Sequence, residues 1–439
     1  MINNKKILIL GMARSGYEVA KLLSKYNNEI TVTDMKDQDE SKLEELSKLN
    51  VKFIKSDDSS NLLDNVDLLI KNPGIRKDHK TVVLAKEKNI EVINEVEAAY
   101  YFLPENVKII GITGSNGKTT TTTMIYDVLK TKLSNVHLAG NIGYPLSSIV
   151  PNIKSGDILV VEISDHQLFD MYKFKTNISV LTNLSEVHLD FHGDYNNYKN
   201  IKKRIFNNHT KEDISIINLD NEDCNLLTSD IVSEKKYFST KTNTNTYLSG
   251  DYIYLNNEKV ININEVLVKG LHNYENIMCT ILVLNELGIE IKYLVEYLKS
   301  FKGVEHRIEF VTNKDNVLYY NDSKSTNVVS TITALKSFKN DTLLILGGLD
   351  RGHSFDELLP YMNNVKAVYS YGETNERIYE WCKINNIKCF KSLTLKETVS
   401  KIKENVLENE VVLLSPACAS WDQYECFEDR GCEFKNLVK

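Results

Sequence analysis

One glycine-rich segment, GITGSNGKTT at 111–120, constrains the fold of this chain more than any other. The apolar residues 107–111 predict a strand that enters it, and the residues after Lys118 predict a helix that leaves it. The backbone N–H groups of such a loop, together with the helix N-terminus, hold phosphate oxygens. The segment therefore predicts a parallel α/β domain that binds a nucleotide.

Two side chains of this loop have the chemistry that a bound nucleotide needs. Lys118 would neutralise the β- and γ-phosphates, and we expect its side chain to be exposed in the absence of nucleotide. Thr119 would offer its hydroxyl to Mg²⁺. The spacing departs from the strict Walker A pattern, because Ile112 stands where that pattern has glycine. A glycine turn with a chance GKT is the alternative, and the predicted strand and helix on either side favour nucleotide binding.

Polar residues end two further apolar runs. Glu162 lies at the end of 158–163, and His188 follows 178–183. The carboxyl ends of parallel strands meet at one edge of a sheet, which is where ligands bind. A carboxylate suits Mg²⁺, and a neutral imidazole can also bind a metal. Structural roles are the alternative for both residues, and the neighbouring phosphate loop favours metal binding.

The first hundred residues alternate short apolar runs with helical segments, which is typical of a doubly wound parallel sheet. Gly11, Ala13 and Gly16 come close to the GxGxxG fingerprint of dinucleotide-binding domains. Asp34 ends the second predicted strand, where an acid can bond a ribose or a base. Because Ala13 replaces the middle glycine, we favour a Rossmann-like domain that does not bind NAD.

Two loops near the C-terminus, NDSKSTN at 321–327 and SPACASWDQ at 415–423, also follow apolar strands. Lys324, Arg351 and Ser420 could hold a small dicarboxylate there, because ligand sites collect at the carboxyl ends of parallel strands. Solvated loops without a ligand are the alternative.

The length of 439 residues exceeds what one hydrophobic core supports, so two or three domains are expected, and the order of predicted strands and helices favours three α/β domains. Residues 1–102 would form a Rossmann-like domain. Residues 103–303 would form a central P-loop-type ATPase domain with a mostly parallel sheet, and 304–439 a second Rossmann-like α/β domain. Within the central domain, the polar stretch 239–259 predicts short antiparallel strands.

The bulk composition excludes several classes of function. The net charge of -7 argues against a general nucleic-acid binder. No apolar run is long enough to span a bilayer, and the run 7–10 is too short for a secretory signal, so we expect a cytoplasmic enzyme. The seven cysteines are odd in number and lack a CxxC pair, which predicts free thiols.

With these motifs in place, the chain resembles the Mur ligases over essentially its whole length. The matching segments run in order: TGSNGKTT at 113–120, AGNIG at 139–143, NLSEVHLD at 183–190, GLHNYEN at 270–276, EHRIE at 305–309, NDSKSTN at 321–327 and SPACASWDQ at 415–423. The last two, with FEDRGCEF at 427–434, are the most specific, because they resemble the family member that adds D-glutamate.

The resemblance implies an activity and its substrates. ATP would phosphorylate the free carboxylate of UDP-N-acetylmuramoyl-L-alanine, and the amine of D-glutamate would attack the acyl phosphate, giving ADP and phosphate in peptidoglycan precursor synthesis. A free carboxylate is a poor electrophile, and the mixed anhydride divides one hard step into two. The partners would be these small molecules, without nucleic acid or membrane insertion, and the enzyme would be a monomer.

The resemblance also assigns residues to sites, position by position. Lys118, His188, Lys202 and Asp322 would be catalytic. The ATP site would comprise Gly114, Ser115, Asn116, Gly117, Lys118, Thr119, Thr120, Asn273, Asn276, Arg307 and Asp322. The UDP-linked substrate would contact Ala13, Arg14, Ser15, Asp34, Gly74, Asn141 and His188, and D-glutamate would contact Lys324, Thr326, Arg351, Ser420 and Phe427.

Two Mg²⁺ sites are implied, one with Thr119 and Glu162 and one with His188 and a carbamylated Lys202. The segment 198–205 predicts a helix in which Lys202 borders an apolar stripe. Burial beside apolar neighbours would lower the lysine pKa and favour the neutral amine that adds CO₂. The new carboxylate oxygens would suit Mg²⁺.

Four residues depart from the family pattern. Asp165 and His166 form Ser-Asp-His where the family usually has Ser-Ser-Phe, and Trp421 replaces a Leu. Val187 stands where an Asp normally precedes the metal-binding histidine. The change at Val187 removes a hydrogen-bond partner for His188.

Other interpretations stay open. One is another Mur-type or folylpolyglutamate-type amide ligase with a different amino acid, although a diamino-acid adder would show a DNPR-like loop where this chain has DSKSTN at 322–327. A second is a catalytically inactive regulatory homologue, which the altered residues 165, 166 and 187 motivate. An NAD-dependent dehydrogenase would rest on the N-terminal glycine turn alone.

Overall fold

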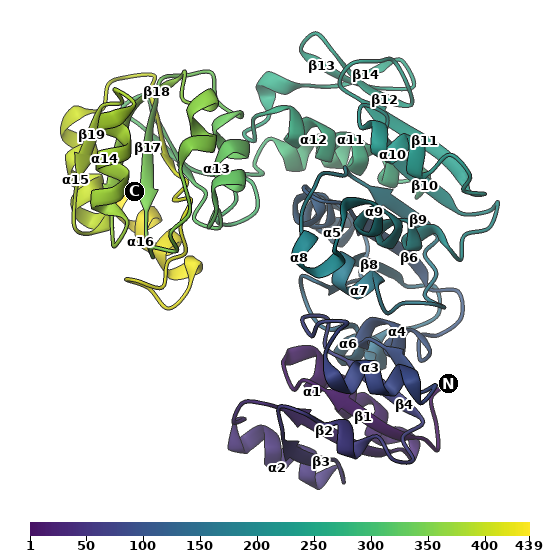
Figure 1. The fold of residues 1–439 in the computed structure, drawn as a ribbon. Helices are drawn as coiled ribbons and strands as arrows, with labels where there is room; N and C mark the ends of the chain where they lie inside the picture. Colours follow the sequence, from purple (N-terminus) through teal and green to yellow (C-terminus); the bar gives the residue numbers. More distant parts are fainter. The chain divides into compact units, whose positions relative to one another are not determined.

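The protein is described here by a computed structural model that covers residues 1–439, except for the side chain of Asp190. The chain divides into two compact units. One holds Met1–Lys259 and Glu275–Ile291, and the other holds Val260–Tyr274 and Lys292–Lys439. The strands form three sheets, which lie within 6–93, 108–262 and 309–414 (Figure 1). The domain boundaries at 103 and 303 stay a prediction.

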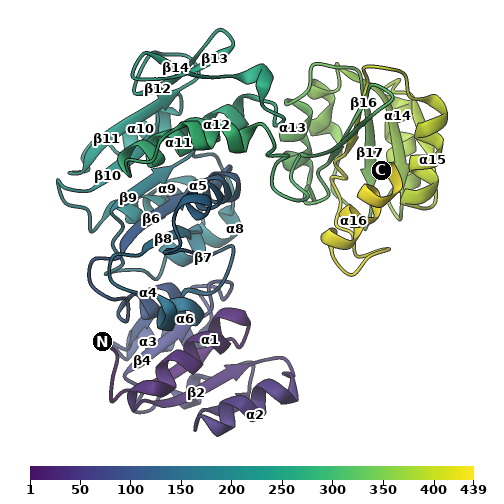
Figure 2. The same ribbon diagram turned by 180° about the vertical axis from the view of Figure 1, so that it is seen from behind.

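The N-terminal part of the first unit is a parallel sheet with the order β3-β2-β1-β4-β5. Its strands and helices are β1 (Lys6–Leu10), α1 (Arg14–Leu23), β2 (Glu29–Asp34), α2 (Glu40–Lys48), β3 (Lys52–Lys55), β4 (Leu68–Lys71), α3 (Lys80–Glu87), β5 (Glu91–Ile93) and α4 (Glu95–Tyr100). Ile9 shares a core cluster with Val19 of α1, and Leu10 shares another with Val82 of α3. Successive strand side chains point to opposite faces, so α1 covers the face seen in Figure 2 and α3 the face seen in Figure 1. The predicted doubly wound sheet is confirmed.

The central sheet has the order β14-β13-β12-β11-β10-β9-β6-β8-β7. Its strands are β6 (Lys108–Thr113), β7 (Val136–Gly140), β8 (Ile158–Glu162), β9 (Ile178–Leu181), β10 (Ile214–Asn218), β11 (Glu234–Ser239), β12 (Thr246–Ser249), β13 (Tyr252–Leu255) and β14 (Glu258–Asn262). The helices are α5 (Lys118–Lys132), α6 (Leu146–Ile149), α7 (Asp165–Leu168), α8 (Leu189–His192), α9 (Tyr195–Lys203), α10 (Glu222–Leu227), α11 (Leu271–Glu286) and α12 (Lys292–Leu298). β6 to β11 pair in parallel, and β12 pairs antiparallel with β13, as predicted for 239–259. β12 joins β11 in parallel, which the sequence did not indicate.

The C-terminal sheet has the order β15-β16-β20-β17-β18-β19, and β15 and β16 form its only antiparallel pair among the described pairings. Its elements are β15 (Glu309–Lys314), β16 (Val317–Asn321), α13 (Val328–Leu335), β17 (Thr342–Gly347), β18 (Val365–Tyr371), α14 (Asn375–Ile384), β19 (Cys389–Lys391), α15 (Leu395–Asn405), β20 (Val411–Leu414) and α16 (Phe427–Val438). Leu344 packs with Ile378 of α14, and Ile345 packs with Phe434 of α16 on the other face. The mixed α/β class with mostly parallel sheets is confirmed.

Two further features concern the cysteines and the helices. The seven cysteines are free thiols, as predicted. Among the described residues, no helix combines the length and the apolar character that crossing a membrane requires.

A buried ion pair ties the N-terminal sheet to the central part of the first unit. Lys71 ends β4, and its Nζ lies 2.9 Å from Asp170 Oδ2, with both side chains fully buried. Lys71 Nζ also donates to the Ile75 carbonyl at 2.9 Å. Burial raises the pKa of Asp170, and the charge of Lys71 opposes that rise. Each charge therefore needs the other to remain buried.

We expect Lys71→Met to lower the free energy of unfolding of the first unit by about 3–5 kcal/mol, because Asp170 would stay buried without its cation. Urea denaturation at neutral pH measures this change. Lys88→Met is the matched control, since Lys88 forms a solvent-exposed pair with Asp64 and its loss should change stability far less. Equal effects of the two substitutions would contradict the importance of the buried pair.

Candidate functional site

The phosphate loop connects β6 to α5 and depends on two glycines whose φ angles are positive. Gly114 has φ +144°, and a Cβ there would lie 2.0 Å from Thr182 Oγ1. Gly117 has φ +82°, and a Cβ there would lie 2.3 Å from Asn276 Oδ1. Both positions therefore exclude other residues, so the loop keeps its backbone close to its neighbours and its N–H groups at the start of α5.

The rest of the loop is fixed by the segment that follows β9. Asn116 N donates to Asn183 Oδ1 at 2.9 Å, and Asn183 Nδ2 donates to the Asn116 carbonyl at 3.1 Å. Ser115 Oγ lies 2.8 Å from the Tyr198 hydroxyl and accepts from Ser185 N at 2.9 Å. Two segments that are distant in sequence thus hold the loop in one conformation.

The prediction that the Lys118 side chain is exposed in the absence of nucleotide is wrong. The side chain is half-buried, and its Nζ donates to the carbonyls of Gly114 at 2.8 Å and Ser115 at 2.9 Å. The curled loop turns these carbonyls toward the ammonium, which satisfies a charge that lies partly out of water. Thr119 and Thr120 follow in the first turn of α5 and are also half-buried.

Glu162 ends β8, beside the strand that leads into the phosphate loop, and its side chain is buried. Asn141 Nδ2 donates to Glu162 Oε1 at 2.7 Å, so the structure places Asn141 against the acid. Glu162 Oε2 is buried and has no hydrogen-bond partner among the residues that the structure describes. A buried carboxylate oxygen without a partner is costly, and a bound cation would satisfy it.

Lys202 lies in α9 and is fully buried, whereas the sequence placed it only at the border of an apolar stripe. Its Nζ donates to Thr113 Oγ1 at 3.1 Å and lies 3.4 Å from Asp165 Oδ1. Burial and the nearby charge of Lys118 lower the pKa of Lys202 to about 7. A large fraction of this amine is therefore neutral near neutral pH.

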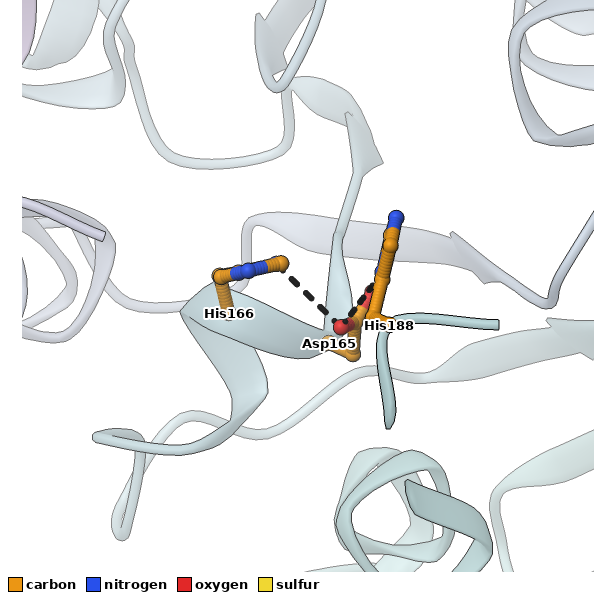
Figure 3. Close-up of side chains that lie close together, drawn as sticks. All are labelled: Asp165, His166 and His188. Atoms are coloured by element: carbon orange, nitrogen blue, oxygen red, sulfur yellow. Dashed lines mark hydrogen bonds and ion pairs between the residues drawn. The ribbon is translucent and has the colours of Figure 1, made fainter. Parts of the chain in front are cut away.

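Asp165, which the sequence marked only as a departure from the family pattern, stands at the centre of three histidines. Its Oδ2 lies 2.9 Å from His188 Nδ1, 2.7 Å from His192 Nε2 and 3.2 Å from His166 Nδ1. Figure 3 shows His166 and His188 on either side of the carboxylate. Burial opposes ionisation of Asp165, yet the three imidazoles and Lys202 hold the pKa of that carboxyl well below its usual range. The only sequence signal was the departure from Ser-Ser-Phe.

A cavity of ≈ 490 Å³ lies at the carboxyl ends of the N-terminal strands, where the strand order reverses. Ala13 and Asp34 line it, and Asp34 accepts from Met12 N at 2.7 Å and from Lys36 N at 2.9 Å. Of the other residues predicted to contact the UDP-linked substrate, none lines this cavity, although three are near it in sequence: Arg14, Ser15 and Gly74.

These three neighbours have contacts of their own. The Arg14 guanidinium lies 5.2 Å from the ring centroid of Tyr144. Asn72 links the other two, because its Nδ2 donates to Ser15 Oγ at 3.2 Å and its Oδ1 accepts from Gly74 N at 3.1 Å.

The second unit brings together the two predicted loops of the C-terminal domain. Asp322 is buried, and its carboxylate accepts from Ser325 Oγ at 2.5 Å, Ser415 Oγ at 2.7 Å and Ile308 N at 3.2 Å. Burial raises the pKa of Asp322 to about 6, and the charge of Arg307 opposes that rise. Asp322 and Arg307 are thus neighbours within this unit.

Arg430 of α16 is a residue that the sequence did not single out. Its side chain is fully buried, with Nε donating to Ser323 Oγ at 2.9 Å and a terminal nitrogen donating to the Ser323 carbonyl at 2.8 Å. The other terminal nitrogen donates to the Cys418 carbonyl at 3.1 Å. One guanidinium therefore fixes both loops, which its several donors in a rigid plane make feasible.

Around these loops lie the residues predicted to contact the amino acid. Lys324 Nζ is 5.1 Å from the Phe427 ring centroid, and the Arg351 guanidinium is 4.8 Å from the Trp421 ring centroid. Ser420 is buried, and its carbonyl accepts from Gln423 N at 3.1 Å.

The remaining predicted residues divide between the units. Thr326 N donates to the Lys324 carbonyl at 2.9 Å. Asn276 lies in the first unit, where its Oδ1 accepts from Thr121 Oγ1 at 3.2 Å. Asn273 lies in the second unit, where its Nδ2 donates to the Lys269 carbonyl at 2.8 Å.

Comparisons with known proteins agree on one family. Models of the Mur ligase MurD-like N-terminal domain, the Mur ligase middle domain and the Mur ligase glutamate ligase domain match residues 5–94, 112–284 and 306–418. UDP-N-acetylmuramoylalanine--D-glutamate ligases of Staphylococcus aureus strains MW2 and JH9 are each 38% identical to this chain over 436 residues, covering 99% of it and 96% of the relative.

Solved structures share the fold. The UDP-N-acetylmuramate-alanine ligase MurC of Thermotoga maritima aligns with a TM-score of 0.61 at 21% identity, covering 99% of this chain and 100% of that one. The MurF ligase of the same organism, in complex with ADP, aligns with a TM-score of 0.60 at 20% identity, covering 95% and 96%. At these identities the likeness supports the three-domain fold alone.

Proposed function

The chain belongs to the Mur ligase family and is an ATP-dependent amide ligase that adds D-glutamate to UDP-N-acetylmuramoyl-L-alanine in peptidoglycan synthesis, and we propose that it does so through an acyl phosphate. The observation that carries the proposal is the buried Oε2 of Glu162 beside the phosphate loop, which no described residue partners. An anionic oxygen there suits the Mg²⁺ that accompanies ATP.

The residues present fit two cations. Glu162 and Thr119 would hold one at the phosphate loop, and His188 with a carbamylated Lys202 would hold the other. Bound Mg²⁺ would supply charge stabilisation to the phosphates. A neutral lysine amine adds CO₂ and releases a proton, which leaves an anionic carbamate. The Lys202 pKa of about 7 supports this reaction, because much of the amine is unprotonated near neutral pH.

The chain's own groups account for the first step. The loop N–H groups would bind the phosphates, and Lys118 would exchange its contacts with the Gly114 and Ser115 carbonyls for phosphate oxygens. A carboxylate oxygen of the substrate would attack the γ-phosphorus, and the bond to ADP would break. Lys118 then stabilises the negative charge that develops in the transition state.

The second step needs the amino acid to be held beside the new anhydride. The D-glutamate amine would attack the carbonyl carbon, and phosphate would leave with its electron pair. Lys324, Thr326, Arg351, Ser420 and Phe427 would contact D-glutamate. Arg430 supports this site by fixing the two loops that carry Lys324, Thr326 and Ser420. For the UDP-linked substrate, Asp34 and the cavity that it lines are the proposed uridine site. We also propose that the enzyme is a cytoplasmic monomer.

Oxygen transfer tests the acyl phosphate. With UDP-N-acetylmuramoyl-L-alanine labelled with ¹⁸O in its free carboxylate, we expect one labelled oxygen in the phosphate that is released when D-glutamate and ATP are supplied. Mass spectrometry of the phosphate measures this transfer. If the label appeared only in the amide product and in water, with none in the released phosphate, the acyl phosphate would be contradicted. D-glutamate addition itself would stand.

A further inference from the structure

The carboxylate of Asp165 gathers side chains from three segments of the central domain. His166 is its neighbour in α7, His188 precedes α8, and His192 ends α8. All three rings approach the same oxygen, Oδ2, at 2.7–3.2 Å, which is the range of N–H···O hydrogen bonds. Lys202 lies against the other oxygen. Both oxygens of the carboxylate therefore have nitrogen partners.

The contact with Asp165 restricts the orientation of the His188 ring. The His188 side chain is 51% exposed, and its backbone lies in the left-handed region with φ +55°. An exposed imidazole in a loop would otherwise sample several rotamers. In Figure 3 one ring nitrogen of His188 faces Asp165 and the other points away from it. The bond to Nδ1 thus orients the ring and leaves Nε2 available.

We propose that Asp165 is the positioning residue for His188: it accepts the Nδ1–H bond and so presents the Nε2 lone pair of His188 to the second cation. This inference rests on the proposed function, in which His188 binds that cation. Carboxylates that hold metal-binding histidines fix both the tautomer and the ring orientation. Val187 cannot provide such a contact, and Asp165 provides it from a different loop.

A competing arrangement would use the same groups as direct ligands. The ligand atoms of Asp165, His166 and His188 all lie within 4.8 Å of one another, so a cation could in principle bind among them. In that case Nδ1 of His188 would bind metal and could not donate to Asp165. The buried His192 ring, which also donates to Oδ2, favours a carboxylate that accepts hydrogen bonds. The experiment distinguishes the two arrangements.

The first readout uses the metal-free full-length protein. ¹⁵N NMR of the His188 ring should show the Nδ1-protonated tautomer, and Asp165→Ser should shift His188 toward the Nε2-protonated form that predominates in free imidazoles. Asp165→Asn keeps an acceptor oxygen and should retain part of the Nδ1–H signal. An unchanged His188 spectrum in the folded Asp165→Ser protein would overturn the proposal, and if that variant does not fold, the Asn variant carries the test.

The second readout is Mn²⁺ binding, measured by electron paramagnetic resonance as a stand-in for Mg²⁺. His188→Ala should abolish one Mn²⁺ site. Asp165→Ser should lower the Mn²⁺ affinity of that same site by about 10- to 100-fold. Asp157→Ser is the matched control, because Asp157 lies 2.8 Å from His137 Nε2 in the same domain. This pair is at the N-terminal ends of β7 and β8, whereas Glu162 is at the C-terminal end of β8. Asp157→Ser should leave Mn²⁺ affinity unchanged.

The outcomes separate the two levels of the argument. If His188→Ala does not alter Mn²⁺ binding, the assignment of His188 in the proposed function fails. If His188→Ala removes a site that Asp165→Ser leaves intact, only the positioning role fails. Zn²⁺ can also be added to the otherwise metal-free protein. If its binding requires both His166 and Asp165, the direct-ligand arrangement is established and the proposal is overturned.

Discussion

Lys118→Ala is expected to lower turnover by about a hundredfold or more while the fold is retained, because the variant loses a key charge that stabilises the transition state. Its described hydrogen bonds are to carbonyls of its own loop, so we expect the melting temperature to change little. Phosphate release with both substrates and ATP measures turnover, and thermal denaturation monitors the fold.

Lys130→Ala is the control for Lys118→Ala. Lys130 lies on the same helix, α5, and contacts only the Ser134 and Val136 carbonyls among its described hydrogen bonds. Its replacement should leave turnover unchanged. Near-normal turnover of Lys118→Ala would contradict the assignment of 111–120 as the phosphate loop.

Lys202→Ala is expected to be nearly inactive and to regain part of its activity when short carboxylic acids are added. The added carboxylate would replace the carbamate oxygens in the pocket left by the side chain. ¹³C NMR with labelled bicarbonate should show a carbamate signal in the wild type that grows as pH rises through about 7, the pKa of the buried amine. The sign follows because only the neutral amine adds CO₂.

Lys203→Ala tests whether this effect is specific to the buried lysine. Lys203 is adjacent in α9 but pairs with Asp230 toward the surface, so its loss should affect neither turnover nor the carbamate signal. An active Lys202→Ala enzyme, together with an unmodified Lys202 in protein prepared with bicarbonate, would contradict the carbamate.

Much of the fold followed from the sequence because strand and helix signals are local. The run 107–111, the glycine loop and the helix after Lys118 carry their periodicity and turn residues within a few positions. The same holds for Glu162, which ends β8, and for Asp322, which follows β16; both therefore lie at the carboxyl edges of their sheets. Polar residues at strand ends were the most informative signal for the candidate site.

The side-chain partners could not be predicted in the same way, since they join segments distant in sequence. Asp165 meets His188 and His192 only because α7 and α8 pack at the same edge of the central sheet. Arg430 reaches Ser323 across more than a hundred residues. Lys118 illustrates a different limit, because its contacts with loop carbonyls depend on backbone geometry that the residue types alone do not specify.

The structure also gives the altered residues near His188 a different interpretation. From the sequence, Asp165, His166 and Val187 motivated an inactive regulatory homologue. In the structure Asp165 occupies the role of hydrogen-bond partner that Val187 cannot fill, so these departures are compatible with an intact metal site. The glycine turn that motivated a dehydrogenase lines the cavity proposed here for uridine.

The choice of amino acid tests the central claim most directly. Purified enzyme with ATP, Mg²⁺ and UDP-N-acetylmuramoyl-L-alanine would be supplied separately with D-glutamate, L-glutamate, meso-diaminopimelate and L-lysine, with phosphate release and product mass as readouts. We predict stoichiometric phosphate release and a ligated product with D-glutamate alone. Ligation of another amino acid in preference to D-glutamate, or of none, would contradict the account.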